Sequence, residues 1–280
     1  MKTLHALGCI AAVFAVISCQ KEAEMAFPVP ATGQLVPVTV EATVPETRVS
    51  LPQGGNLPVW NQGDRIGILT SDNVLCPPFT AKTGGSASTT FTGEKPEGSR
   101  LAVAFFPYQA DATLKDSRLS LTLPHSQSGK VAEAVMVATG NEDDGFQFQS
   151  VCTLVRMDIP ASLDIRKVEL VRDDRVTGPF SVGTSLNVTS AAPSSYLEKR
   201  AEVTGTSALS GEVILSVLPS SSKKIQLAMT RSDGKVAFVN STFTSGKAYE
   251  AGRIKNLGTV NQTLTFYDAA LVADPSNQQL

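Results

Sequence analysis

The chain has 280 residues, of which 24 are Lys or Arg and 26 are Asp or Glu, and its formal net charge is −2 at pH 7. This balance argues against nucleic-acid binding, which calls for a basic face toward the phosphate backbone. The sequence has two histidines and no C-x-x-C spacing, so a zinc site would have almost no ligands. The length is sufficient for two domains of typical size, and one domain of unusual length is the alternative.

A short apolar run begins after Lys2 and ends at Cys19. It is shorter than the roughly 18 apolar residues that span a bilayer, and it is typical of the core of a signal peptide. The order Val16-Ile17-Ser18-Cys19 resembles the lipobox of bacterial lipoproteins, in which Cys19 would be the lipidated first residue. We therefore expect residues 1–18 to be a lipoprotein signal peptide, with an ordinary signal peptide as the alternative.

Several acyl chains hold a lipoprotein in a membrane almost permanently, so the lipobox predicts a protein tethered to the outer membrane. The polar, acidic residues 20–24 resemble the export signals that send some lipoproteins to the cell surface. Residues 19–34 as a whole are polar, contain proline and lack periodicity, which indicates a flexible leash between the lipid and the first folded element.

The first predicted strand covers residues 36–42. Val36, Val38 and Val40 alternate with polar residues or proline, which is the period of a half-buried strand. Pro37 has no amide hydrogen, so either the strand lies at a sheet edge or Pro37 stands among the first residues of the strand. We expect an edge strand.

Many short strands follow, each bounded by Gly, Pro, Asp or Ser. Gly63-Asp64 is a predicted turn that leads into a strand ending at Leu69, and Asp233-Gly234 is a strong hairpin signal. The remaining predicted strands cover residues 88–92, 101–106, 119–123, 151–159, 167–172, 212–218, 225–230, 236–243 and 248–254. Helical periodicity is limited to a turn or two at residues 196–201 and 269–273.

The strongest interruption lies at residues 141–145, Asn-Glu-Asp-Asp-Gly. We place a domain boundary there, with one β-sandwich over residues 35–145 and a second over residues 146–280. The predicted fold class is all-β.

Two cysteines could pair in an exported protein, Cys76 and Cys152. Cys76 precedes two prolines in a predicted loop and Cys152 begins an apolar strand. These surroundings favour two separate free thiols, and a disulfide is the alternative.

The sequence gives little support for a catalytic site. His125 is the only histidine after residue 18, so a catalytic triad would have a single possible base, and no G-x-S-x-G motif is present. Ser220 and Lys223 have the S-x-x-K spacing, but they follow Pro219 in a predicted turn rather than lying on a helix. Asp143-Asp144 and Asp173-Asp174 are interpreted as solvated turn residues. We expect no enzyme and no cofactor or metal.

The chain resembles the fimbrillins and fimbrillin-like lipoproteins, which build surface pili in certain gram-negative bacteria. The residues that carry the resemblance are Cys19 in its lipobox; Thr47-Arg48; Trp60, Gly63-Asp64 and Ile66-Gly67-Ile68; Phe106-Pro107-Tyr108; Phe146 and Phe148; Leu218-Pro219; Asp233-Gly234-Lys235; and Thr244, Gly246-Lys247 and Tyr249. The resemblance implies two tandem transthyretin-like β-sandwich domains and a role as a fimbrial subunit or pilus-associated adhesin. The expected partners are other pilin subunits, the outer membrane and a host or bacterial surface ligand.

The same resemblance implies assembly by strand exchange after proteolysis behind the first strand. The candidate cut follows Arg48, which would release the strand containing Val36, Val38 and Val40; the alternative is that Arg48 is a solvent-exposed loop residue. The best donor segment is 263–273, where Leu264 and Phe266 could fill pockets of another subunit. The alternative, which we favour, is that this segment closes the second domain.

A glycan-binding surface lipoprotein is the rival function, because it would share the anchor and the β-sandwiches. Sugar platforms usually present exposed aromatic faces. Trp60 is the only tryptophan, but its apolar surroundings favour a place in the core, and Tyr108 and Tyr249 are expected to pack at strand ends.

Overall fold

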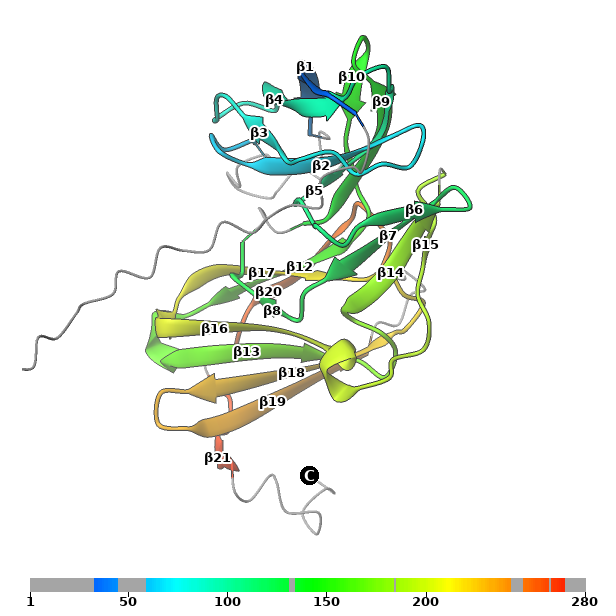
Figure 1. Ribbon diagram of the computed structural model, residues 1–280. Helices are drawn as coiled ribbons and strands as arrows, with labels where there is room; N and C mark the ends of the chain where they lie inside the picture. The colour runs from blue at the N-terminus through cyan, green and yellow to red at the C-terminus, as the bar shows by residue number, and fades with distance from the viewer. Residues whose placement is uncertain are drawn as a thin grey trace, which may run out of the picture.

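The computed structural model describes residues 33–44, 59–130, 134–183, 185–242, 249–261 and 263–269. Strands dominate this part of the chain, which also contains two short 3-10 turns, η2 (Ala161–Leu163) and η3 (Tyr196–Lys199). The predicted all-β class is therefore confirmed. The strands form two stacked bodies, with the first strand in the upper body and the last in the lower one (Figure 1).

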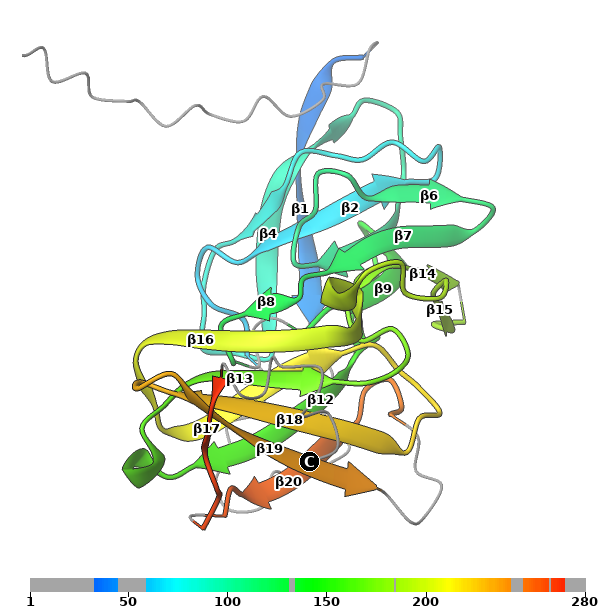
Figure 2. The same cartoon turned by 90° about the horizontal axis from the view of Figure 1, so that it is seen from below.

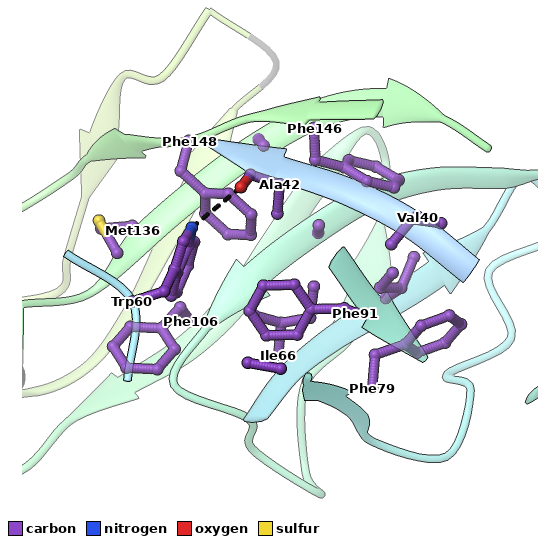
Figure 3. Close-up of a cluster of buried hydrophobic side chains, with 14 of the residues drawn as sticks. Val40, Ala42, Trp60, Ile66, Phe79, Phe91, Phe106, Met136, Phe146 and Phe148 are labelled. Atoms are coloured by element: carbon purple, nitrogen blue, oxygen red, sulfur yellow. Dashed lines mark hydrogen bonds between the residues drawn. The ribbon is translucent and has the colours of Figure 1, made fainter. Parts of the chain in front are cut away.

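The upper body is an eight-stranded sheet in the order β10-β1-β4-β3-β2-β5-β9-β11. Its strands are β1 (Leu35–Thr43), β2 (Arg65–Thr70), β3 (Phe79–Ala81), β4 (Ser88–Pro96), β5 (Leu101–Phe106), β9 (Met136–Asn141), β10 (Gly145–Gln147) and β11 (Gln149–Ser150). Because β10 also pairs with β9, the sheet curls back on itself around an aromatic core. Figure 3 shows this core, with Trp60 between Phe106, Phe148 and Phe91.

The lower body has two sheets that enclose a second core (Figure 2). One sheet has the order β17-β12-β20, made of β12 (Thr153–Ile159), β17 (Gly211–Val217) and β20 (Ile254–Thr259). The other has the order β21-β19-β18-β13-β16-β8, made of β8 (Ser126–Gln127), β13 (Ile165–Val171), β16 (Arg200–Leu209), β18 (Lys224–Arg231), β19 (Lys235–Thr242) and β21 (Tyr267–Asp268).

A four-stranded sheet in the order β15-β14-β7-β6 lies beside the junction of the two bodies (Figure 1). It consists of β6 (Thr113–Lys115), β7 (Arg118–Leu123), β14 (Gly178–Gly183) and β15 (Val188–Thr189). Leucines of β7 and Phe180 of β14 face a third core, which they share with Phe105 of the upper body and Val151 at the entry to the lower one.

Local sequence patterns locate most of these strands. The hairpin at Asp233-Gly234 joins β18 and β19, with Gly234 at φ +82°, and the turn at Gly63-Asp64 leads into β2. The strand predicted over residues 248–254 is wrong in its described part. Gly252 has φ +70° and donates its N–H to the carbonyl of Cys152 at 2.9 Å. Before this turn Tyr249 forms only an isolated bridge with Ser220, and β20 begins after the turn at Ile254.

The division of the chain between residues 145 and 146 stays a prediction, and strand pairs cross that position. β1 pairs with β10, β7 with β14 and β8 with β16. The two halves of the sequence are therefore connected through main-chain hydrogen bonds as well as through side chains.

Candidate strand-exchange site

The first strand, β1, is paired along its whole length on one side only. It runs antiparallel to β4, from Leu35 opposite Pro96 to Thr43 opposite Ser88. On its other side β10 pairs with Ala42 and Thr43 alone. Within the described residues, the outer edge of β1 therefore has no strand partner before Ala42. The edge position that Pro37 predicts is found over most of β1.

The inward side chains of β1 become more buried toward its C-terminal end. Val36 and Val38 are half-buried, whereas Val40 is 1% exposed and Ala42 is completely buried. Val44, just after the strand, is also buried. The predicted alternation of Val36, Val38 and Val40 is present, but only Val40 of the three is enclosed by the aromatic core.

Trp60 holds the buried end of β1 in place through a hydrogen bond and ring contacts. Its indole Nε1 donates a hydrogen bond to the carbonyl of Ala42 at 3.0 Å (Figure 3). Its ring meets those of Phe91, Phe106 and Phe148 edge to face, with centroids 4.9–5.4 Å apart. Trp60 is 1% exposed, so it is a core residue, as expected, and it offers no platform for a sugar.

The amide N–H of Phe148 donates to the carbonyl of Thr43 at 2.9 Å, next to the bond from Trp60. Both bonds join β1 to residues far from it in the sequence. Local periodicity carries no information about such contacts, and sequence reasoning missed them.

An ion pair joins β4, on one side of β1, to the turn between β9 and β10, on the other. Lys95 of β4 lies opposite Val36, and its Nζ is 2.5 Å from Oε1 of Glu142 in the β9–β10 turn. The other carboxylate oxygen of Glu142 accepts the N–H of Leu101 at 3.0 Å. Partial desolvation alone would raise the pKa of Glu142, but the hydrogen bonds from Lys95 and the backbone outweigh it, so the pKa is lowered.

The proposed donor residues pack on the lower body. Leu264 and Phe266 are partly buried against the second core, and the guanidinium of Arg231 lies 5.1 Å from the Phe266 ring centroid. Tyr267 of β21 pairs with Val236 of β19. β1 and β21 lie at opposite ends of the molecule (Figure 1). Any filling of the β1 position by this segment would therefore involve a second copy of the chain.

Two of the predicted site residues, Cys19 and Arg48, lie outside the described residues. Lipidation of Cys19 and cleavage after Arg48 stay predictions.

Cys76 and Cys152 are free, buried thiols in separate cores. Burial raises the pKa of Cys76 to about 11 and that of Cys152 to about 12, which disfavours the reactive thiolate. The expectation of two separate free thiols is confirmed.

The paired aspartates are turn residues with different partners. The N–H groups of Asp143 and Asp144 donate to Oδ1 of Asn141, as in an exposed turn. Asp174 instead forms an ion pair at 3.0 Å with the fully buried side chain of Arg172, so it is not merely solvated. Ser220, from the S-x-x-K spacing, donates its hydroxyl to Asp174.

The described part of the chain contains no group of three or more His, Cys, Asp or Glu residues placed to hold a metal ion. None of its helices is long and apolar enough to cross a membrane.

Comparison with known proteins finds no matching family model and no matching curated protein. Solved structures do show similarity. A candidate cell adhesion protein from Bacteroides uniformis is 17% identical, with a TM-score of 0.48 over 83% of this chain and 97% of its own. One from Bacteroides ovatus is 15% identical, with a TM-score of 0.48 over 84% and 96%.

The tip fimbrial protein Mfa3 from Porphyromonas gingivalis, truncated at its C-terminus, is 9% identical, with a TM-score of 0.40 over 84% of this chain and 98% of its own. Mfa3 is a fimbrial protein, as are the proteins that the sequence motifs resemble. The function proposed below depends on the geometry of β1 and its neighbours.

Proposed function

We propose that the chain is a surface-exposed fimbrillin-like lipoprotein, a pilus subunit or pilus-associated adhesin, that assembles by exchange of β1. In this proposal Cys19 carries the lipid, and two tandem transthyretin-like sandwiches meet near residue 145. The observation that carries the proposal is β1 itself, a strand near the N-terminus that packs into the aromatic core yet pairs with β4 on one side and with β10 only at Ala42 and Thr43 on the other.

Removal of β1 would open a site suited to another strand. The edge of β4 would lose its partner along the whole register, and the apolar surface beneath Val40 and Ala42 would face water. Unpaired strand edges beside an apolar groove bind extended segments through main-chain hydrogen bonds and side-chain pockets. A strand from another subunit would satisfy both.

Attachment to the chain would keep β1 in place until a protease acts. A flexible linker holds a bound segment at an effective concentration of roughly millimolar, and burial of each enclosed valine adds roughly 1.5–3 kcal/mol. An incoming strand would have to compete against both. A cut after Arg48 would remove the covalent link and make departure of β1, with the leash and lipid, effectively irreversible.

The donor in this proposal is the segment that contains Leu264 and Phe266, supplied by a second copy. Both side chains are only partly buried where they now lie. The competing role, closure of the lower body, is supported by the pairing of β21 with β19.

Limited digestion tests the exchange step. Folded precursor treated with an arginine-specific protease should shorten once, near Arg48, and then form oligomers visible by size-exclusion chromatography. An Arg48→Gln variant is the matched control and should remain full-length and monomeric. Wild-type protein that is cut after Arg48, loses β1 and still stays monomeric would contradict the proposal.

A deletion of residues 261–280 separates the two roles of the C-terminal segment. Loss of assembly with unchanged thermal stability would identify a donor, whereas a large fall in melting temperature would identify a closing strand. Mass spectrometry of the N-terminus from cells tests the anchor: lipid on Cys19 marks an unprocessed or anchoring form, and a start at Val49 marks a processed subunit. An unlipidated start at another residue would overturn both assignments.

A further inference from the structure

The four-stranded sheet carries a concave depression of about 540 Å³ on its outer face. The floor is formed by β7 and β14, and the walls by the segments around Asp111 and Ala191. Ligand sites commonly have volumes of about 300–1,000 Å³, so the depression has the size of a small-ligand site.

The depression is lined by hydroxyl groups because the two floor strands alternate. Leu119, Leu121 and Leu123 face the third core, as does Phe180. The residues between them therefore point outward. The resulting outward residues are Ser120 and Thr122 on β7 and Pro179 and Ser181 on β14, and Ser190 follows β15.

Strand register brings these hydroxyls into one row. Ser120 lies opposite Ser181, and Ser181 lies opposite Thr189 on β15. Thr122 lies opposite Pro179, whose exposed ring supplies an apolar surface beside the row. Hydroxyl groups can both donate and accept hydrogen bonds.

Part of this hydrogen-bonding capacity is unused within the protein. Ser181 and Thr189 bond to each other at 3.1 Å and also accept from Arg118. The side-chain hydroxyls of Ser120, Thr122 and Ser190 make no hydrogen bond with any other residue that the structure describes. All three are exposed, so they are available to a ligand.

The guanidinium in the wall is already neutralised. Arg175, 6% exposed, forms an ion pair with Glu198 at 2.9 Å and donates to the carbonyls of Ala191 and Ala192 at 2.8 Å. The pKa of Glu198 is lowered by the N–H of Ser194 and by Arg175. Arg175 thus fixes the wall rather than attracting an anion, and the exposed carboxylate of Asp111 has no ion-pair partner within the described residues.

We propose that this depression binds a neutral carbohydrate. Free hydroxyls and a carboxylate acceptor match the hydroxyls of a sugar, the Pro179 ring can contact a sugar face, and the one free charge disfavours anions. The proposal deepens the adhesin part of the proposed function and rests on it, but it does not require strand exchange, so binding and assembly can fail separately.

The test uses unprocessed, monomeric protein on an array of neutral and acidic oligosaccharides, followed by calorimetry with a neutral oligosaccharide that is retained. A Ser120→Ala/Thr122→Ala variant removes two hydroxyls without adding bulk and should bind about tenfold more weakly or worse, the loss expected when hydrogen bonds to a ligand are removed. Thr113→Ala is the matched control, since Thr113 lies opposite Ser120 on β6 but outside the depression. It should bind as the wild type does.

Thr122→Arg fills the depression and should abolish binding; melting temperatures near that of the wild type establish that the variants are folded. Retention of no glycan, retention of acidic glycans alone, or neutral-glycan binding that survives Thr122→Arg would each overturn the proposal. Protein that binds a neutral glycan but does not oligomerise after cleavage at Arg48 would support this site while contradicting strand exchange.

Discussion

β1, the first strand, and β20, the last strand of more than two residues in the described chain, each pair with a single strand over most of their length but are held very differently. β1 is antiparallel to β4 over nine residue pairs and ends in the aromatic core. β20 is parallel to β12, with an irregularity in register between Arg156 and Asp158, and none of its side chains is fully buried. Parallel pairing is slightly less stable per residue than antiparallel pairing.

The difference indicates which end of the chain can leave its place readily. β20 has no fully buried side chain of its own to lose on release, whereas release of β1 would uncover Val40 and Ala42. The proposed assembly uses this difference. In it the C-terminal segment would be the donor, and β1 would leave only after an irreversible event such as a cut in the chain.

The largest effect is expected from Trp60→Ala, which tests whether β1 depends on the aromatic core. Loss of a fully buried aromatic side chain costs about 3–5 kcal/mol in the free energy of unfolding, and the bond to the carbonyl of Ala42 is lost with it. Urea denaturation measures the change. Val59→Ala is the neighbouring control, since Val59 is 40% exposed and its loss should cost less than about 0.5 kcal/mol.

Hydrogen exchange on the same Trp60→Ala variant should show the amides of β1 losing protection before those of β12. Uniform loss of protection throughout the chain would contradict a special dependence of β1 on Trp60.

The sequence predicts the features of β1 that enter this comparison. The alternating valines and Pro37 predict a half-buried edge strand, and the Gly63-Asp64 and Asp233-Gly234 pairs predict turns at their observed places. These features depend on neighbouring residues, which is why local patterns reveal them. The buried place of Trp60 follows equally from its apolar surroundings.

The features that sequence patterns miss depend on residues far apart in the chain. The bond from Trp60 to Ala42 and the pairing of β7 with β14 are long-range contacts. The alternating pattern of a single strand is compatible with many registers against its partner, so the pattern does not reveal the pairing. The strand predicted over residues 248–254 fails for a local reason, because Gly252 at positive φ turns the chain within it. The hydroxyl row at the carbohydrate site likewise appears only when β7, β14 and β15 are set side by side.

A pair of substitutions by alanine sharpens the comparison between β1 and β20. Val40→Ala removes two methyl groups from a fully buried site and should cost about 2 kcal/mol of unfolding free energy. Leu257→Ala in β20 removes a larger group, but Leu257 is only partly buried, so we expect about 1 kcal/mol or less. Chemical denaturation of both variants measures the difference, and a larger loss at Leu257 would reverse the ranking of the two strands.

The smallest expected effect concerns the ion pair that spans the neighbours of β1. Glu142→Gln weakens the contact between β4 and the β9–β10 turn and should cost about 1 kcal/mol or less at pH 7, the scale of an ion pair that solvent screens. The folded-state pKa of Glu142 is lowered, so its stabilisation is fully present above the unfolded-state pKa and is lost as the pH falls through the folded value.

The difference in stability between wild type and Glu142→Gln should therefore shrink in acid below about pH 4, near the unfolded pKa of a glutamate. Urea denaturation at pH 7 and pH 3 measures it. Glu94→Gln, an exposed carboxylate next to Lys95 on β4, is the control and should show little change at either pH. A Glu142→Gln effect equally large at both pH values would mean that shape rather than charge joins β4 to the β9–β10 turn.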